Sequence, residues 1–181
     1  LHQPHATNQL DQVSSYVPSA EIHALVEDAT GVAEMRSVCR HPAVSSVGLG
    51  DNDLRASLHL RGDSALNFIR TQLVIELAAA GKKPPTASVF PNIKDTEGLY
   101  RDSIRLRDLG FIGRAAIHPA QLDPIRRAFK PSPSEVTNAR KVIRAAELAS
   151  ADGRGAVALE DGSFVDQPFV EEARWILSLV D

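Results

Sequence analysis

Four times after residue 21, a short and continuously apolar run is followed by a segment in which apolar residues recur at helical spacing. The four runs lie at 22–28, 44–50, 86–92 and 114–119. Short apolar runs without strict alternation are typical of strands buried on both faces, as in parallel sheets covered by helices. The pattern predicts an α/β fold of four βα units, which fits either a small open doubly wound sheet or half of an eightfold barrel.

Residues that commonly begin and end helices mark the segments between and after these runs. Helices are expected over 64–80 and 96–109, from 132 onward, and near 168–180. Ser64 is the expected N-cap of the first of these and Gly81 its C′ residue. Ser132 and Glu135 match the capping-box pattern around a proline, which predicts where the third helix begins.

Composition and charge are those of an ordinary globular chain with one buried core: 43% of the 181 residues are apolar and 24% are charged. The formal charge of −3, with Lys and Arg scattered along the chain, argues against nucleic-acid binding. The most apolar window, 73–81, is shorter than the about 20 residues of a membrane-spanning helix, so no membrane contact is expected. Cys39 is the only cysteine, which suits a reducing compartment and predicts a cytoplasmic protein.

Acidic residues follow two of the expected strands at their carboxyl ends, where βα proteins hold their ligand sites. Glu27 closes the first run and Asp53 follows the second, so both carboxylates could bind one ion. Mg²⁺ usually takes one or two carboxylates and leaves its other positions to water and substrate. Spacing alone nevertheless favours the simpler interpretation, in which both acids serve turns and helix caps. The glycines at 48 and 50 lead into a helix whose free N–H groups can bind a carboxylate, although this pattern is weak by itself.

Longer segments carry a more specific signal. The segment DLGFIGRAAIHPAQLDPIRRAFKPSPSEVTNARKVI, residues 108–143, resembles the C-terminal barrel segment of the aldolase/citrate lyase family (HpcH/HpaI type), in the branch of citrate lyase beta subunits and malyl-CoA-type lyases. The segments ALVEDATGV, GLGDNDLRASL and SVFPNIKDTEGL are similar to that family's fifth, sixth and seventh strands, and DGSFVDQPFVEEAR to its C-terminal extension. The resemblance implies a (β/α)8 TIM-type barrel. This chain would supply the C-terminal half, strands 5 to 8, over 1–150 and a loop-and-helix extension over 151–181.

The same resemblance implies roles for individual residues. Glu27 and Asp53 match the family's Mg²⁺ ligands, and the backbone of Gly50, Asn52 and Asp53 matches the part that holds the substrate's carboxylate. Asp166 matches an acid/base residue that is often delivered to a neighbouring subunit's site. Many members of the branch carry glutamate where Asn52 stands, which leaves the specificity of this chain open.

Two further residues match recurrent positions of the branch and are carried as substrate-binding candidates. Arg70 lies in an expected helix, where a solvated or salt-bridged arginine is the more common finding. His118 lies in the diagnostic motif AIHPAQ, where a histidine that only fixes the loop is the alternative.

The implied activity is Mg²⁺-dependent cleavage or formation of a 3-hydroxyacyl-CoA thioester such as citryl-CoA or malyl-CoA. Two alternatives remain open: an aldolase that acts on a 2-oxo acid without CoA, and a catalytically incomplete homologue that acts as a subunit or interaction module. The expected partners are a small acyl-CoA or 2-oxo acid and further copies of the chain, in a homo-oligomer that is a trimer or hexamer. The sequence begins with Leu and lacks the family's first four strands, so we expect that upstream sequence or an oligomer completes the barrel.

Overall fold

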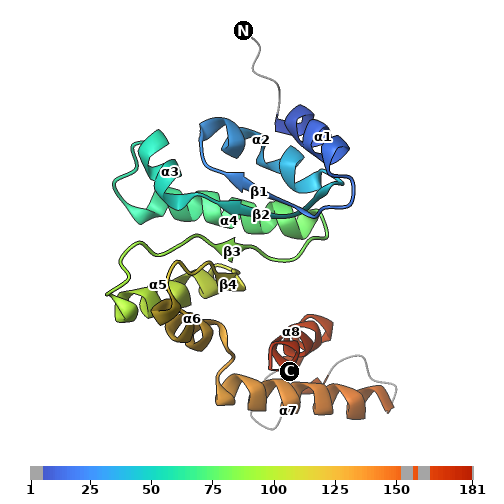
Figure 1. The fold of residues 1–181 in the computed structure, drawn as a ribbon. Coiled ribbons are helices and arrows are strands. Elements are labelled where there is room, and N and C mark those ends of the chain that lie inside the picture. The colour runs from blue at the N-terminus through green and yellow to red at the C-terminus, as the bar shows by residue number, and fades with distance from the viewer. Residues whose placement is uncertain (1–5, 152–156, 159–163, 181) are drawn as a thin grey trace. The chain divides into compact units, whose positions relative to one another are not determined.

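Between residues 22 and 129, each strand is followed by one or two helices, as the repeated pattern predicts (Figure 1). The computed structural model describes residues 6–151, 157–158 and 164–180, and the chain forms two compact units, Leu1–Phe129 and Lys130–Asp181. The first unit contains, in order, α1 (Ala6–Tyr16), β1 (Ile22–Val26), α2 (Ala29–Arg40), β2 (Val44–Leu49), α3 (Asp51–Ser57), α4 (Asp63–Ala79), β3 (Thr86–Ala87), α5 (Thr96–Asp108), β4 (Gly113–Arg114), the 3-10 helix η1 (Pro119–Gln121) and α6 (Leu122–Phe129). The second contains α7 (Pro133–Ala151), β5 (Val157–Ala158), β6 (Phe164–Val165) and α8 (Gln167–Ser178).

The first unit is built on parallel strand pairs. β1 pairs with β2 from Ile22↔Val44 to Val26↔Leu49, and β3 pairs with β4. The pairing joins consecutive βα units, which confirms the α/β class. The third and fourth strands are only two residues long, shorter than the expected runs at 86–92 and 114–119. Beyond β3, the carbonyls of Ser88 and Phe90 accept hydrogen bonds from side chains, so they do not continue a strand ladder.

The main core lies on one face of the β1–β2 pair, under α2 and α4. Its most buried side chains include Met35, Val47, Leu54, Leu66, Leu73 and Leu77. The other face of β1 is open: Leu25 is 57% exposed, whereas its neighbour Val26 is 2% exposed. The expectation that this strand is buried on both faces is therefore wrong for the described chain. Its outward residues line a cavity instead.

Helix ends agree with the sequence in most cases. Gly81 ends α4 with φ +67, as expected of a C′ glycine. Ser132 and Glu135 form the predicted capping box: Ser132 N–H donates to Glu135 Oε2 at 2.7 Å, and Glu135 N–H donates to Ser132 Oγ at 3.2 Å. Ser64 is not an N-cap, because α4 already begins at Asp63, whose carboxylate is held by two arginines.

One helix and one boundary differ from the expectation. No element was expected before residue 21, yet α1 packs on α2 through Leu10, and its Asp11 Oδ1 lies 3.1 Å from His41 Nε2. The expected domain limits, 1–150 and 151–181, stay a prediction, and the compact units divide after Phe129 instead. The physical reason is that α7 packs on α8, in a cluster that includes Ala139, Val142, Val170 and Ala173.

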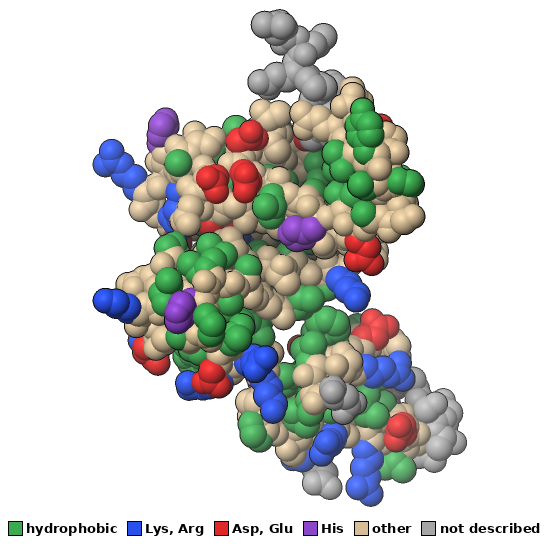
Figure 2. Space-filling view, viewed as in Figure 1, with side chains coloured by type: hydrophobic (Ala, Val, Ile, Leu, Met, Phe, Trp, Pro, Cys, Tyr) green, Lys and Arg blue, Asp and Glu red, His purple; other side chains and the backbone are tan. Residues whose placement is uncertain are grey.

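Lys and Arg side chains are scattered among acidic and hydrophobic ones on the face of the first unit that Figure 2 shows. Within the described ranges, no helix combines the length and the apolar character that crossing a membrane requires. The cytoplasmic location stays a prediction.

Candidate metal and substrate site

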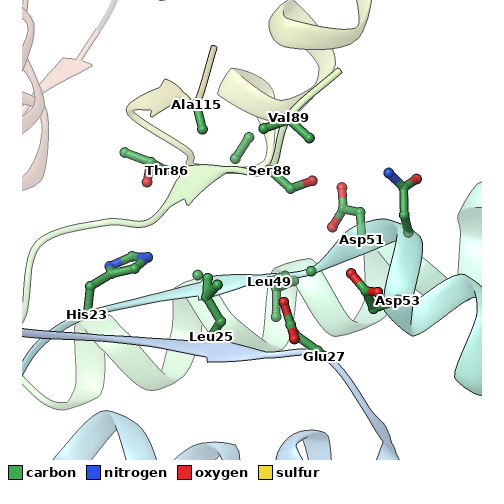
Figure 3. Close-up of a pocket in the computed structure, with 14 residues that line it drawn as sticks. His23, Leu25, Glu27, Leu49, Asp51, Asp53, Thr86, Ser88, Val89 and Ala115 are labelled. Atoms are coloured by element: carbon green, nitrogen blue, oxygen red, sulfur yellow. The ribbon is translucent and has the colours of Figure 1, made fainter. Parts of the chain in front are cut away.

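A cavity of about 240 Å³ lies in the first unit over the open face of β1 and β2 (Figure 3). Glu27 follows β1 and Asp53 lies in the first turn of α3, so both acids come from the carboxyl ends of neighbouring parallel strands. Ser88 and Val89, just after β3, form the opposite wall. The predicted residues Glu27, Gly50, Asn52 and Asp53 all line this cavity.

Gly50 brings the two carboxylates together. Its N–H donates to Val26 O at 3.0 Å, which holds it beside the end of β1. A β-carbon placed on Gly50 would lie 2.7 Å from Glu27 Cγ, 2.8 Å from Glu27 Oε1 and 3.1 Å from Asp53 Oδ2. One point in space is thus close to an oxygen of each acid, and the two oxygens are at most about 6 Å apart. Only glycine leaves this space open.

The donor set fits a hard cation with few protein ligands. Glu27 and Asp53 are both exposed to the cavity and offer carboxylate oxygens, which Mg²⁺ prefers. Among the described residues, no group of three or more His, Cys, Asp or Glu side chains is placed to hold a metal. Two carboxylates are within the usual number for Mg²⁺, whereas a closed zinc cage needs four ligands.

The start of α3 is fixed from behind by a buried ion pair. Asp51 Oδ2 accepts from Arg70 Nη2 of α4, and Arg70 Nη1 donates to Asn67 Oδ1 at 2.8 Å. Asp51 lines the cavity, while Arg70 is not among its lining residues. The structure therefore places the Arg70 guanidinium on Asp51, and a direct contact of Arg70 with substrate stays a prediction. The sequence pattern gave no indication of this pair.

His118 and Gln121 organise the loop that carries the diagnostic motif. His118 is exposed, and its Nδ1 accepts from the N–H of Ala120 at 3.1 Å, which caps η1. Gln121 is fully buried: its Oε1 accepts from Ile117 N–H at 2.9 Å, and its Nε2 donates to Phe90 O at 2.8 Å. Neither residue lines the cavity. His118 thus has a structural contact, and its role toward substrate stays a prediction.

Arg114 supports the cavity wall, although sequence reasoning did not single it out. Its buried guanidinium donates to Ser88 O and to Ser103 Oγ, both at 3.0 Å, and pairs with Asp102 of α5. The carbonyl that it holds belongs to the cavity-lining Ser88. An arginine that follows a glycine at the start of a short run gives no sequence signal for such a buried network.

Asp166 lies in the second unit, immediately before α8. It occupies the N-cap position, yet its side chain makes no capping hydrogen bond. Its Oδ1 is buried and has no hydrogen-bond partner within the described part of the chain. Helix capping therefore does not account for this carboxylate, and its predicted acid/base role stays a prediction.

The comparison with known families decides the assignment. Residues 5–119 match the model of the HpcH/HpaI aldolase/citrate lyase family. The chain belongs to this family. A (3S)-malyl-CoA thioesterase of Cereibacter sphaeroides is 34% identical over 171 residues, which cover 93% of this chain and 60% of that protein. The citrate lyase subunit beta of Escherichia coli is 30% identical, over 88% of this chain and 54% of that subunit. The chain thus spans somewhat more than half the length of these relatives.

A solved structure agrees with this family membership. The crystal structure of CitE from Mycobacterium tuberculosis in complex with magnesium, acetoacetate and coenzyme A matches 99% of this chain and 67% of its own, with a TM-score of 0.81 and 26% identity. The α/β fold of this HpcH/HpaI chain is therefore that of a citrate lyase beta structure. The assignment of its strands to the second half of a barrel stays a prediction.

Proposed function

We propose that this chain carries the metal- and carboxylate-binding part of a Mg²⁺-dependent carbon–carbon lyase that acts on a 3-hydroxyacyl-CoA thioester such as malyl-CoA or citryl-CoA. The observation that carries the proposal is the convergence of Glu27 and Asp53 on one point above Gly50. Family membership supports it, and so do a relative named as a malyl-CoA thioesterase and a neighbour that binds magnesium and coenzyme A.

Glu27 and Asp53 would hold Mg²⁺, with the remaining positions left to water and to the substrate. When bound, the ion would stabilise negative charge on a substrate oxygen as a carbon–carbon bond breaks or forms, which contributes several kcal/mol. The protein's part is to keep both carboxylates on the same side of the β1–β2 pair without a side chain between them. Gly50 fulfils that requirement.

The first turn of α3 would receive the carboxylate of the substrate's acid portion. The first N–H groups of a helix have no partner within the helix, and α3 has no side-chain cap. Asn52 and Asp53 therefore present backbone donors at the cavity, next to the acids that would hold the ion. The Asp51–Arg70 pair would keep these donors in place before substrate arrives, which lowers the cost of binding.

Asp166 would donate or accept the proton at the substrate carbon whose carbon–carbon bond is broken or formed. Its buried Oδ1 has no hydrogen-bond partner among the described residues, so this carboxylate could accept a proton without first losing a hydrogen bond that they make. Because Asp166 belongs to the second unit, the proposal includes its delivery to a site in another copy of the chain, in a trimer or hexamer. Light scattering of the purified chain tests that assembly.

A catalytically incomplete subunit is the second candidate, and a specific observation favours it. One face of β1 is open, where Leu25 is 57% exposed, so the described residues do not enclose the cavity by themselves. Such a subunit would bind Mg²⁺ or an acid without turning over a thioester.

The deciding experiment measures Mg²⁺ binding by calorimetry and turnover of malyl-CoA and citryl-CoA by the 181-residue chain, with separate detection of bond cleavage and thioester hydrolysis. Glu27→Gln and Asp53→Asn should each lower Mg²⁺ affinity at least tenfold and abolish cleavage.

Glu97→Gln is the matched control, because Glu97 is an exposed helix acid paired with Arg101. Unchanged Mg²⁺ binding and turnover in both site variants would refute the metal site. Intact Mg²⁺ binding without turnover of either thioester would favour the incomplete subunit.

A further inference from the structure

The end of β3 brings one more polar side chain to the cavity, and the proposed function does not use it. Side chains alternate between the two faces of an extended chain. Ala87, the last residue of β3, is buried in a cluster with Leu106 of α5, so its neighbour Ser88 faces the opposite way and lines the cavity. Figure 3 shows the Ser88 side chain directed toward Asp51 and Asp53. Ser88 therefore faces the first turn of α3.

Three strands that lie side by side end in cavity-lining residues at the same edge. Glu27 follows β1, Gly50 follows β2 and Ser88 follows β3, and all three line the cavity. β3 contacts β2, as β2 pairs with β1. Ligands of parallel α/β folds bind beyond the carboxyl ends of the strands. Ser88 thus has on the third strand the place that the proposed site residues have on the first two.

The backbone of Ser88 is fixed, while its hydroxyl is left for a ligand. Arg114 Nε donates to Ser88 O at 3.0 Å, and the same guanidinium donates to Ser103 Oγ and pairs with Asp102. The Arg114 side chain is only 2% exposed. None of the described residues is hydrogen-bonded to the Ser88 hydroxyl. A hydroxyl on a fixed backbone can bind a ligand at a low cost in ordering.

A structural role does not account for a serine at this position. A serine beside a helix commonly caps it or bonds to a nearby backbone group. Here α5 is capped by Asp95, whose Oδ1 accepts from Gly98 N–H at 2.8 Å. The carbonyls of Ser88 and Phe90 accept from arginine and glutamine side chains instead. Among the described residues, the Ser88 hydroxyl therefore serves no element of the fold, and an alanine would pack equally well.

We propose that Ser88 is a substrate-binding residue, whose hydroxyl donates a hydrogen bond to the carboxylate of the substrate's acid portion, and that Arg114 is a positioning residue that acts through it. The backbone N–H groups of Asn52 and Asp53 hold this carboxylate from one side, and Ser88 holds it from the opposite wall. Two carboxylate oxygens offer about four acceptor positions, so both sets of donors can bind together. The identity of the ligand, the 2-oxo or 2-hydroxy acid portion of the thioester, rests on the proposed function.

The test is an NMR titration of the 181-residue chain with pyruvate, a small 2-oxo acid, in the presence of Mg²⁺. The amide resonances of Asn52 and Asp53 report binding at α3. Ser88→Ala should weaken pyruvate binding about tenfold, because a hydrogen bond to a charged group commonly contributes that much.

Two further substitutions separate the hydroxyl from the volume of the side chain. Threonine and valine have nearly the same shape and differ in the hydroxyl. Ser88→Thr should retain most of the affinity for pyruvate, and Ser88→Val should lose as much as Ser88→Ala. Ser57→Ala is the control, because Ser57 is an exposed serine of α3 in the same unit, and its affinity should equal that of the unaltered chain.

Arg114→Lys tests the positioning role. Lysine keeps the charge beside Asp102 but lacks the planar fork that serves three partners. It should weaken pyruvate binding several-fold in the unaltered chain and have no further effect in Ser88→Ala, since Arg114 acts through Ser88. Ser103→Ala removes another partner of the same guanidinium and should lower the unfolding free energy without changing the affinity. An equal loss from Arg114→Lys with and without the Ser88 hydroxyl would overturn the positioning role.

Measurements of Mg²⁺ separate this inference from the proposed function. Mg²⁺ affinity without pyruvate should be the same in Ser88→Ala and the unaltered chain, because Ser88 is not a proposed ligand of the ion. Pyruvate binding that Ser88→Ala and Ser88→Val leave unchanged would overturn the inference and leave the proposed function standing. Pyruvate binding that depends on Ser88 in a chain that binds no Mg²⁺ would have the opposite meaning. A chain that binds no pyruvate, with or without Mg²⁺, would overturn both.

Discussion

Arg70 of α4 forms a buried ion pair with Asp51, the first residue of α3, and so joins the helix that begins at the site to the helix behind it. The two side chains are only 5% and 12% exposed. Removing one partner of a buried pair leaves the other charge without compensation, which typically costs 3–5 kcal/mol. The pair is therefore a stability feature of the first unit as well as a support for the site.

Arg70→Met should lower the free energy of unfolding by about 3 kcal/mol or more, measured by urea denaturation. Arg101→Met is the matched control, because Arg101 and Glu97 form an exposed pair on α5, for which a loss of about 0.5 kcal/mol is expected. The double variant Asp51→Asn with Arg70→Met should recover part of the loss, since neither charge is then left alone. Equal effects of Arg70→Met and Arg101→Met would contradict the importance of the buried pair.

Gly50→Ala should weaken Mg²⁺ binding by about tenfold or more, because its β-carbon would occupy the space between Glu27 and Asp53 and displace both side chains. Gly50 has φ −89, which alanine adopts without strain, so the unfolding free energy should change little. Gly62→Ala is the control: nothing lies within 4 Å of its added β-carbon. The comparison requires Mg²⁺ titration and urea unfolding of both variants. A Gly50→Ala chain that binds Mg²⁺ normally would show that the two acids do not share an ion.

The local features of the fold could be read from the sequence, because each depends on residues that are close along the chain. The capping box of Ser132 and Glu135 and the left-handed glycine at 81 are of this kind. The short lengths of β3 and β4 could not be predicted. They depend on hydrogen bonds that Arg114 and Gln121 donate to backbone carbonyls more than twenty residues earlier in the chain. An apolar run in the sequence does not show that the side chain of a distant residue will donate a hydrogen bond to one of its backbone carbonyls.

The same distinction holds in the site. Glu27 and Asp53 could be placed at one edge of the sheet in advance, because the carboxyl ends of adjacent parallel strands meet there, although spacing alone did not indicate a shared ion. The ion pair of Asp51 and Arg70 could not be predicted, because a single sequence does not distinguish a buried helix arginine from the many exposed ones.

Cys39 should be nearly unreactive toward Ellman's reagent at pH 8 in the folded chain and react rapidly in urea. Burial, with a smaller contribution from the negative charge of Glu76, raises the pKa of its thiol to about 11. The folded state therefore holds this proton more tightly than the unfolded state, whose thiol has a pKa near 8.5. This contribution to stability is present below about pH 8.5 and is lost as the pH rises toward 11. Rapid labelling of the folded chain, at a rate independent of urea, would contradict it.

Asp63 should make the first unit sensitive to acid. Hydrogen bonds from Arg105 and, next, from Arg55 hold the pKa of this carboxyl below its usual value. Because the pKa of Asp63 is lower in the folded state, its contribution to stability is present at pH values above the pKa of the unfolded state, about 3.9. The contribution is lost as the pH falls through the pKa of the folded state. Because the side chain is 43% exposed, solvent and salt screen these contacts and the effect should be modest.

Asp63→Asn should therefore flatten the decrease in unfolding free energy below pH 4, measured by urea denaturation across a pH series at low salt. Asp108→Asn is the matched control on the same unit, because Asp108 is 65% exposed and contacts Arg107 only at 4.0 Å. Added salt should reduce the difference between the unaltered chain and Asp63→Asn, since the screening length shortens as ionic strength rises. If both variants keep the full acid dependence of the unaltered chain, the arginine contacts of Asp63 do not set the acid stability of this unit.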